Sequence, residues 1–129
     1  MKKILVVDDD DDVLETIKLI LEIGGYEVDA LNDATLVFEN IDEFNPDLIL
    51  LDIVLGKIDG RTVCKQIKSH NDTRHIPVLL MSGLYEIKEV QDMECAPDDF
   101  MLKPFKMDDL LQKIEKLTNK SSLKYGIKE

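Results

Sequence analysis

Two kinds of hydrophobic pattern alternate along this chain. Continuous apolar runs occupy residues 4–7, 48–51 and 78–81, and such runs are typical of parallel strands that are covered on both faces. Residues 26–31 alternate between apolar and polar positions, and residues 100–102 form a short apolar segment. These two segments predict strands at the edges of the sheet. The chain is therefore expected to contain five strands.

Between these segments the apolar residues follow the period of a helix. The first predicted helix begins in an acidic run and ends at Gly24-Gly25, because glycine commonly terminates helices. Further helices are predicted over residues 34–41, 61–69, 86–94 and 106–117. The residues expected to face the core from the first, third and fifth helices are Val13, Leu14, Ile17, Ile20, Leu21, Val63, Cys64, Ile67, Leu110, Leu111, Ile114 and Leu117.

The alternation of strands and helices predicts an α/β fold with a parallel sheet. Right-handed crossovers, with the second and fifth strands at the edges, give the strand order 2-1-3-4-5 in a single doubly wound (βα)5 sandwich. We expect this domain to span residues 1–118. Residues 119–129 lack periodicity and are interpreted as a C-terminal tail or a truncated linker.

Composition restricts the classes of function. The 129 residues are 44% apolar and carry 27 acidic against 16 basic side chains, a formal charge of −11. A chain of this charge is repelled by phosphate backbones and by anionic lipid, so neither nucleic-acid nor membrane binding is expected. No apolar stretch is long enough to span a membrane, and we expect a cytoplasmic protein. Cys64 and Cys95 are far apart in the sequence without a CxxC motif, so they are interpreted as small, partly buried hydrophobic residues.

Acidic residues follow the first and third predicted strands, which are neighbours in this order. Asp8 and Asp9 come directly after residues 4–7, and Asp52 comes directly after residues 48–51. The carboxyl ends of these strands border the crevice where open α/β sheets bind ligands. Carboxylates that share a site repel one another unless a cation joins them, and Mg²⁺ prefers oxygen ligands. The later acids, Asp10 to Asp12, are expected to cap the following helix.

Two further polar residues follow the fourth and fifth strands at the same edge. Ser82 ends the fourth strand and Lys103 follows the fifth. An ammonium, a hydroxyl and a cation around a carboxylate provide what phosphoryl transfer requires, because they stabilise the charge on the moving phosphoryl oxygens. The pattern indicates an aspartyl phosphate on Asp52.

With these residues in place, the sequence closely resembles the response-regulator receiver domains of bacterial two-component signalling, which have a flavodoxin-like fold. The resemblance covers residues 2 to about 118. Four motifs carry it in this order: residues 4–9, residues 46–52 followed by Asp59-Gly60, residues 77–82, and residues 98–105.

The resemblance implies specific roles. Asp52 is the expected phosphoacceptor, and Mg²⁺ or Mn²⁺ is the expected cofactor, held by Asp8, Asp9, Asp52 and the backbone carbonyl of Val54. Ser82 and Lys103 are expected to bind phosphoryl oxygens. The Lys103–Pro104 peptide bond is expected to be cis.

The resemblance also implies how the signal leaves the domain. Phosphorylation is expected to draw Ser82 toward the phosphoryl group and to turn Phe100 inward. The face formed by the fourth helix, fifth strand and fifth helix is thereby remodelled. The implied partners are a sensor histidine kinase or a histidine phosphotransfer (HPt) protein, and then an effector protein or an output domain beyond this chain. The protein is expected to be a monomer or a phosphorylation-linked homodimer.

Several positions depart from the usual family pattern. Gly56 stands where proline is common and is expected to loosen the loop after Asp52. Ala96-Pro97 replaces the common Gly-Ala pair. Val54 and Leu84 lie two residues beyond Asp52 and Ser82, where family members control access of the hydrolytic water. Both are apolar, which predicts a long-lived phosphoryl group.

Two alternatives remain open at this stage. Residues 9–14 also fit the DxDx(T/V) signature of haloacid-dehalogenase-like phosphohydrolases, in which Asp9 would be the nucleophile and Asp52 would have no task. A pseudo-receiver would bind partners without phosphorylation. We expect a phosphoacceptor with autocatalytic phosphotransfer and autodephosphorylation, and not an enzyme in the ordinary sense.

Overall fold

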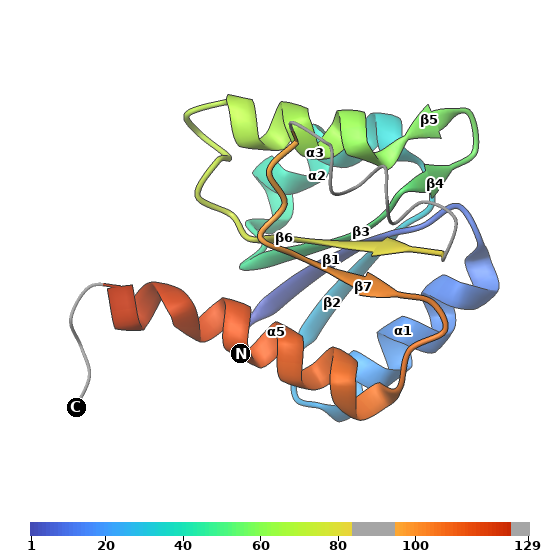
Figure 1. Ribbon diagram of the computed structural model, residues 1–129, viewed down its shortest axis with the longest axis vertical. Coiled ribbons are helices and arrows are strands. Elements are labelled where there is room, and N and C mark those ends of the chain that lie inside the picture. The colour runs from blue at the N-terminus through green and yellow to red at the C-terminus, as the bar shows by residue number, and fades with distance from the viewer. Residues whose placement is uncertain (84–94, 125–129) are drawn as a thin grey trace.

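The structure is a computed structural model. It describes residues 1–83 and 95–124, with side chains described up to residue 119. Figure 1 shows a central sheet with helices on both faces. The predicted helix over residues 86–94 lies outside the described residues, as does Leu84.

The sheet has five parallel strands in the order β2-β1-β3-β6-β7. This arrangement confirms the predicted fold and the predicted strand order 2-1-3-4-5. The central strands β1, β3 and β6 are almost completely buried, as their continuous apolar runs predict. The strands are β1 (Lys3–Val7), β2 (Glu27–Leu31), β3 (Leu48–Asp52), β6 (Val78–Ser82) and β7 (Asp99–Leu102).

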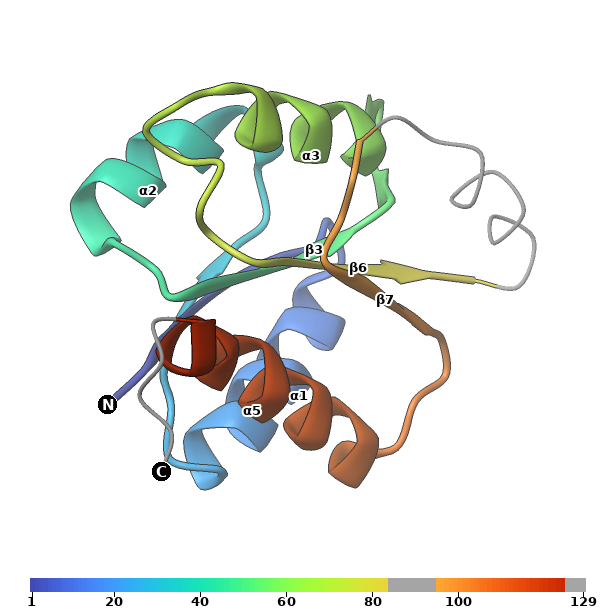
Figure 2. The same ribbon diagram turned by 60° about the vertical axis from the view of Figure 1, so that its left-hand side comes forward.

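Four α-helices of the described residues cover the sheet. Helices α2 and α3 lie on one face, and α1 and α5 lie on the other (Figure 2). A short 3-10 helix, η1, precedes α2. The bounds are α1 (Asp11–Ile23), η1 (Ala34–Leu36), α2 (Val37–Phe44), α3 (Gly60–Ser69) and α5 (Met107–Lys124).

The sheet separates two hydrophobic cores, because side chains alternate between its faces along each strand. In β3, Ile49 and Leu51 belong to the core under α2 and α3, which we call the α2/α3 core. Leu48 and Leu50 belong to the core under α1 and α5, the α1/α5 core. Both cysteines are buried in the α2/α3 core, more completely than their interpretation as partly buried residues predicts.

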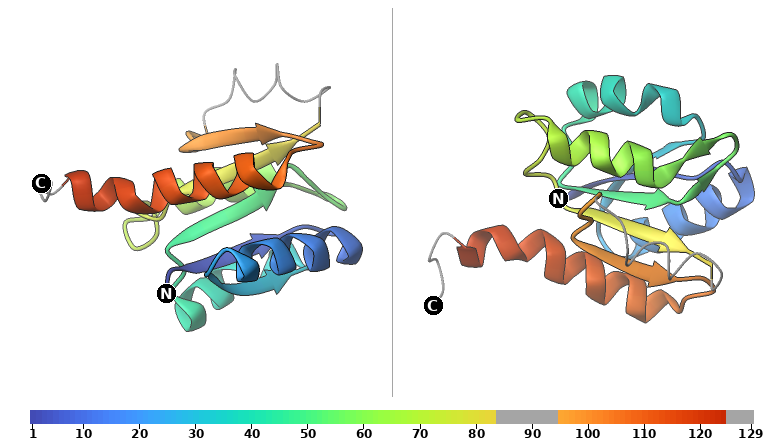
Figure 3. Two further views of the ribbon diagram at one scale, coloured as in Figure 1. Left: turned by 90° about the horizontal axis from the view of Figure 1, so that it is seen from below. Right: turned by 45° about the horizontal axis from the view of Figure 1, so that its top comes forward.

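Three local features differ from the prediction. The first turn of the helix expected over residues 34–41 is a 3-10 turn. The segment after Asp52 contains a two-stranded antiparallel hairpin formed by β4 (Val54–Leu55) and β5 (Ile58–Asp59), although only a loop was expected. Helix α5 continues to Lys124 instead of ending at residue 117. Its last turns run past the end of the sheet (Figure 3). Apolar periodicity marks only the part of a helix that packs on a core, so the prediction stopped at Leu117, which is buried.

Candidate phosphoryl and metal site

The strand register brings Asp8 and Asp52 together. Strands β1 and β3 are parallel neighbours in which Val7 is paired with Leu51, so the next residues of the two strands lie side by side. Residues two apart in a strand point to the same face, so Asp8 points as Val6 does and Asp52 points as Leu50 does. Both of these apolar residues face the α1/α5 core. The two carboxylates therefore emerge on the same face of the sheet at its carboxyl edge.

Asp8, Asp9 and Asp52 form a carboxylate cluster at this edge. Each offers an oxygen that lies within 4.8 Å of the oxygens of the other two. Asp8 is 1% exposed and Asp52 is 5% exposed, whereas Asp9 is exposed. Burial raises the pKa of Asp8 above its ordinary value, and the neighbouring Asp52 raises it further, although a hydrogen bond from the Asp10 amide opposes these effects. Burial and the neighbouring carboxylate thus disfavour the charged form of Asp8.

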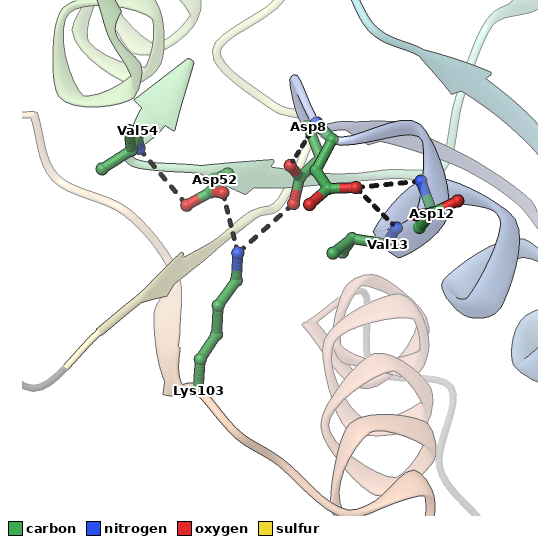
Figure 4. A network of polar contacts seen from close by, with 7 residues as sticks. Asp8, Asp12, Val13, Asp52, Val54 and Lys103 are labelled. Atoms are coloured by element: carbon green, nitrogen blue, oxygen red, sulfur yellow. Dashed lines mark hydrogen bonds and ion pairs between the residues drawn. The ribbon is translucent and has the colours of Figure 1, made fainter. Parts of the chain in front are cut away.

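Lys103 reaches this cluster from the segment after β7. Its Nζ lies 2.8 Å from an oxygen of Asp52 and 3.3 Å from an oxygen of Asp8, between the two carboxylates (Figure 4). Burial works against the charged ammonium, but the hydrogen bonds and charges of Asp52 and Asp8 outweigh it and raise the pKa of Lys103. Three carboxylates and one ammonium leave a formal charge of −3 + 1 = −2 at the site.

Ser82 lies at the end of β6, at the same edge of the sheet. Its side chain is fully buried, and its hydroxyl oxygen has no hydrogen-bond partner among the described residues. Buried polar groups are nearly always hydrogen-bonded, so an unpartnered buried hydroxyl points to a missing ligand. The Lys103 amide donates to the Ser82 carbonyl at 2.8 Å, and this bond fixes the two residues relative to each other.

The segment after Asp52 is ordered by local contacts. The Val54 amide donates to Asp52 Oδ1 at 3.3 Å, and the Val54 side chain is 53% exposed beside it. Gly56 has a φ of +65° at the first position of the two-residue turn between β4 and β5. Tight hairpin turns require this backbone conformation, and glycine adopts it without strain. Gly56 therefore helps form a hairpin in the segment where a loosened loop was expected.

Comparison with known proteins shows which family the chain belongs to. A family model described as a response regulator receiver domain matches residues 4–115. The chain belongs to the response regulator receiver family. It is 33% identical over 122 residues to the DNA-binding dual master transcriptional regulator RpaA of Synechocystis sp., a match covering 94% of this chain and 51% of RpaA. It is equally identical over 122 residues to the response regulator MprA of Mycobacterium ulcerans, covering 94% and 52% of the two chains. The receiver chain thus spans about half the length of these curated relatives.

Solved receiver structures share the fold. The signal receiver domain of a signal transduction histidine kinase from Syntrophus aciditrophicus has a TM-score of 0.86 at 31% identity, covering 93% of this chain and 92% of that chain. The receiver domain of NtrX from Brucella abortus has a TM-score of 0.81 at 33% identity, covering 90% and 98% of the two chains. No helix among the described residues of the receiver has the length and hydropathy that crossing a membrane requires. The family is one of signalling receivers and not of classical enzymes.

Among the other predicted site residues that the structure describes, Pro104 follows Lys103 at the same edge, whereas Phe100 is the second residue of β7 and lies nearer the opposite end of that strand. The Lys103–Pro104 peptide bond is cis. Phe100 is half-buried on β7 and packs against the α2/α3 core. Asp10 caps α1 by accepting from the amides of Asp12 and Val13, which confirms its predicted capping role.

Asp59-Gly60 has no role that the sequence pattern predicts, although this pair shapes the geometry after Asp52. Asp59 caps α3 by accepting from the Arg61 amide, and the charged Arg61 side chain lowers the pKa of Asp59. A Cβ on Gly60 would overlap the backbone carbonyl of Asp52 and lie 2.8 Å from the Ile53 Cα. Only glycine allows α3 to begin this close to the end of β3. An Asp-Gly pair at the start of an amphipathic helix was the available signal.

The donor set of the receiver fits a hard divalent cation. Carboxylate oxygens are the ligands that Mg²⁺ and Mn²⁺ prefer, and three of them converge here at a site with a formal charge of −2. A divalent ion would neutralise that charge.

Proposed function

We propose that this receiver is a phosphorylatable switch in which Asp52 accepts a phosphoryl group from a histidine kinase or an HPt protein. The observation that carries the proposal is the convergence of Asp8, Asp9, Asp52 and Lys103 on one point at the carboxyl edge of the sheet. Asp8, Asp9, Asp52 and the Val54 carbonyl are the proposed ligands of Mg²⁺, which when bound would neutralise charge on the acids and on the phosphoryl oxygens.

In the proposed transfer, an oxygen of Asp52 attacks phosphorus while the bond from phosphorus to the donor's imidazole nitrogen breaks. Lys103 Nζ, 2.8 Å from Asp52, is positioned to pair with one phosphoryl oxygen. The buried Ser82 hydroxyl is available to donate to another, because it has no partner among the described residues. Both groups are held by the protein before the reaction, so they need little reorganisation to stabilise the developing charge.

The proposed output starts at Ser82. Strand alternation places Ser82 on the same face as Leu80, which is paired with Phe100 on the neighbouring strand. Leu80 and Phe100 both contact the α2/α3 core. A shift of Ser82 toward a phosphoryl group would change the space beside Phe100. Phe100 also lines a groove of about 700 Å³ over β7 and α5, together with Leu102, Phe105 and Lys113. We propose this groove as part of the face that an effector protein or output domain recognises.

The proposed donor docks beside the site. A groove of about 600 Å³ runs along α1 to the segment after β7, lined by Val13, Ile17, Ile20, Lys103 and Phe105. Its apolar side chains suit an amphipathic helix carrying a phosphohistidine, and Lys103 lies at its end beside Asp52. The exposed residues Glu15 and Lys18 on α1 are proposed to select the cognate partner.

We further propose a cytoplasmic location, a domain spanning residues 1–118, and a connection to any output domain through residues 119–129. Oligomeric state is proposed to be monomeric or a phosphorylation-linked homodimer. Since α5 continues to Lys124, such a connection would begin as a helix.

Incubation with acetyl phosphate and Mg²⁺, followed by intact mass and site mapping, tests the proposal. The wild type should gain one phosphoryl group on Asp52, and Asp52→Asn should gain none. Asp12→Asn is the matched control, because Asp12 is an exposed acid nearby that is not in the carboxylate cluster, and it should be phosphorylated like the wild type. Phosphate on Asp9, or phosphomonoesterase activity that survives Asp52→Asn, would instead indicate the phosphohydrolase. An unmodified wild type would indicate the pseudo-receiver.

A further inference from the structure

The two cysteines of the chain are in contact although 31 residues separate them. Cys64, in α3, donates its thiol hydrogen to the Cys95 carbonyl at 3.4 Å. The two side chains also interact, and each affects the pKa of the other thiol. Both residues carry thiols in this structure, and their exposed fractions are 0% and 1%. No local sequence motif predicts this contact, because the fold alone brings the two side chains together.

Contacts of Asp98 with α3 and β6 hold the segment that follows Cys95 in place. Lys68 of α3 pairs with Asp98 at 2.6 Å, and Asp98 also accepts from the Val78 amide of β6 at 2.8 Å. Between Cys95 and Asp98 the chain turns sharply, with a φ of +54° at Ala96 followed by Pro97. Figure 2 shows this segment starting beside α3 and descending into β7. Cys95 is therefore fixed opposite Cys64 by its neighbours as well as by its own contacts.

We propose that Cys64 and Cys95 form a modification site, at which a peroxide oxidises the two thiols to a reversible intramolecular disulfide. In the first step one thiolate attacks a peroxide oxygen, the oxygen–oxygen bond breaks, and a sulfenic acid and one water form from hydrogen peroxide. In the second step the other thiol attacks the sulfenic sulfur, the disulfide forms, and a second water leaves. Two thiols and one hydrogen peroxide thus give one disulfide and two waters, and a dithiol reductant reverses the change.

Burial determines when the pair reacts. It raises the pKa of both thiols, and thiolates are the reactive species. The closed arrangement is therefore slow to oxidise, and reaction requires a local opening that admits the oxidant. Once one sulfur is oxidised, the neighbouring thiol lies within contact distance and captures it. The pairing thus directs oxidation to a disulfide and away from the irreversible higher oxides.

The disulfide would act on the output path of the receiver, and this consequence rests on the proposed function. Cys64, Cys95, Leu80 and Phe100 all belong to or pack against the α2/α3 core. A covalent bond from α3 to residue 95 would restrain the start of β7, the strand that carries Phe100. The carboxylate cluster lies on the α1/α5 side, so phosphorylation of Asp52 should continue in the oxidised protein.

The experiment treats the full native chain with hydrogen peroxide, quenches remaining thiols by alkylation, and measures intact mass without reductant. The wild type should lose two hydrogen atoms, resist alkylation, and yield a Cys64–Cys95 cross-linked peptide that disappears after reduction. Cys64→Ser and Cys95→Ser should each give no such loss. Cys64→Ala provides a second test if the serine variants fail to fold by circular dichroism. The unfolded wild-type chain in denaturant shows that the peroxide dose is sufficient.

Three outcomes would overturn the site. In the first, the thiols stay reduced in the native chain at a peroxide dose that oxidises the unfolded chain. In the second, the protein gains oxygen without a cross-link. In the third, the disulfide joins two chains and not Cys64 to Cys95 within one chain. Phosphorylation by acetyl phosphate is measured on the same oxidised sample. If the cross-link does not form but phosphorylation is normal, only this inference is overturned. If the cross-link forms but the protein accepts no phosphoryl group in either its oxidised or its reduced form, only the proposed function is overturned.

Discussion

The carboxylate cluster predicts that removing the buried charge of Asp8 stabilises the metal-free protein. Asp8→Asn keeps the shape of the side chain and an oxygen that can accept from the Asp10 amide. It removes a buried negative charge that lies beside Asp9 and Asp52. The substitution should therefore raise the free energy of unfolding when no divalent ion is bound.

The magnitude follows from the distances. At an effective dielectric constant of about 20, two charges within 4.8 Å repel by at least about 3.5 kcal/mol. The attraction between Asp8 and Lys103 at 3.3 Å is about 5 kcal/mol on the same scale. Two lost repulsions exceed one lost attraction by about 2 kcal/mol. Asp9 is exposed and Lys103 is partly exposed, so screening reduces every contribution, and we expect Asp8→Asn to gain about 1–2 kcal/mol.

Urea denaturation followed by circular dichroism, in EDTA and in excess Mg²⁺, measures this effect. Mg²⁺ at about 100 times its dissociation constant should stabilise the wild type by about 2.7 kcal/mol, and should stabilise Asp8→Asn much less. The control Asp12→Asn should lose about 0.3–1 kcal/mol in both conditions, because an exposed acid in the first turn of α1 interacts with the helix dipole. A destabilised Asp8→Asn in EDTA, or equal stabilisation of variant and wild type by Mg²⁺, would refute the reasoning.

The same charge gives a pH dependence of known sign. Burial, reinforced by Asp52, raises the pKa of Asp8 above the ordinary 3.8, so the folded state binds this proton more tightly than the unfolded state. Without Mg²⁺, this group lowers wild-type stability as the pH rises from 3.8 through the raised pKa. The advantage of Asp8→Asn should therefore shrink as the pH falls through that window, and a constant advantage down to acid pH would contradict the assignment.

Three further substitutions test other parts of the structure. Ala96→Gly should raise the free energy of unfolding, measured by urea denaturation, by about 0.5–1 kcal/mol. The left-handed conformation of Ala96 costs a non-glycine residue about 1–2 kcal/mol, and the greater freedom of glycine in the unfolded chain offsets about 0.4–1 kcal/mol of this. A less stable variant would count against this reasoning. Gly60→Ala should destabilise by about 1–3 kcal/mol, since its Cβ would overlap the Asp52 carbonyl, while Thr62→Ala on the exposed face of α3 should change stability by less than about 0.5 kcal/mol. Val54→Asn should shorten the lifetime of phosphorylated Asp52 several-fold by orienting water beside it; the wild-type phosphoryl group should outlast seconds in Mg²⁺, and a half-life of only seconds would disprove the predicted long lifetime.

The sequence predicted the sheet well because burial on both faces leaves a strong signal. Runs such as Leu48 to Leu51 are apolar throughout, and weaker patterns marked the edge strands β2 and β7. From the strand order, it followed that residues after β1 and β3 meet at one edge. Register and parity then place Asp8 beside Asp52, which the order alone does not state.

The hydrophobic pattern of the sequence could not predict features that depend on local geometry or on contacts between distant residues. Strands β4 and β5 have two residues each, too few to show a period. The sequence over the last turns of α5, residues 119–124, has no apolar periodicity that would have marked its length. The contact between Cys64 and Cys95 and the unpartnered hydroxyl of Ser82 are properties of the folded chain, because each depends on residues that are remote in sequence.

Because the sheet divides the interior into two cores, it limits how a conformational change can pass from one core to the other. The acids and the ammonium of Lys103 sit on the side of α1 and α5, whereas Phe100 and Leu80 pack on the opposite side. The amide-to-carbonyl bond from Lys103 to Ser82 lies at the rim where the two compartments meet. A chemical event on one side can thus reach the other by moving one short piece of main chain around the border, without disturbing the tightly packed strands between them.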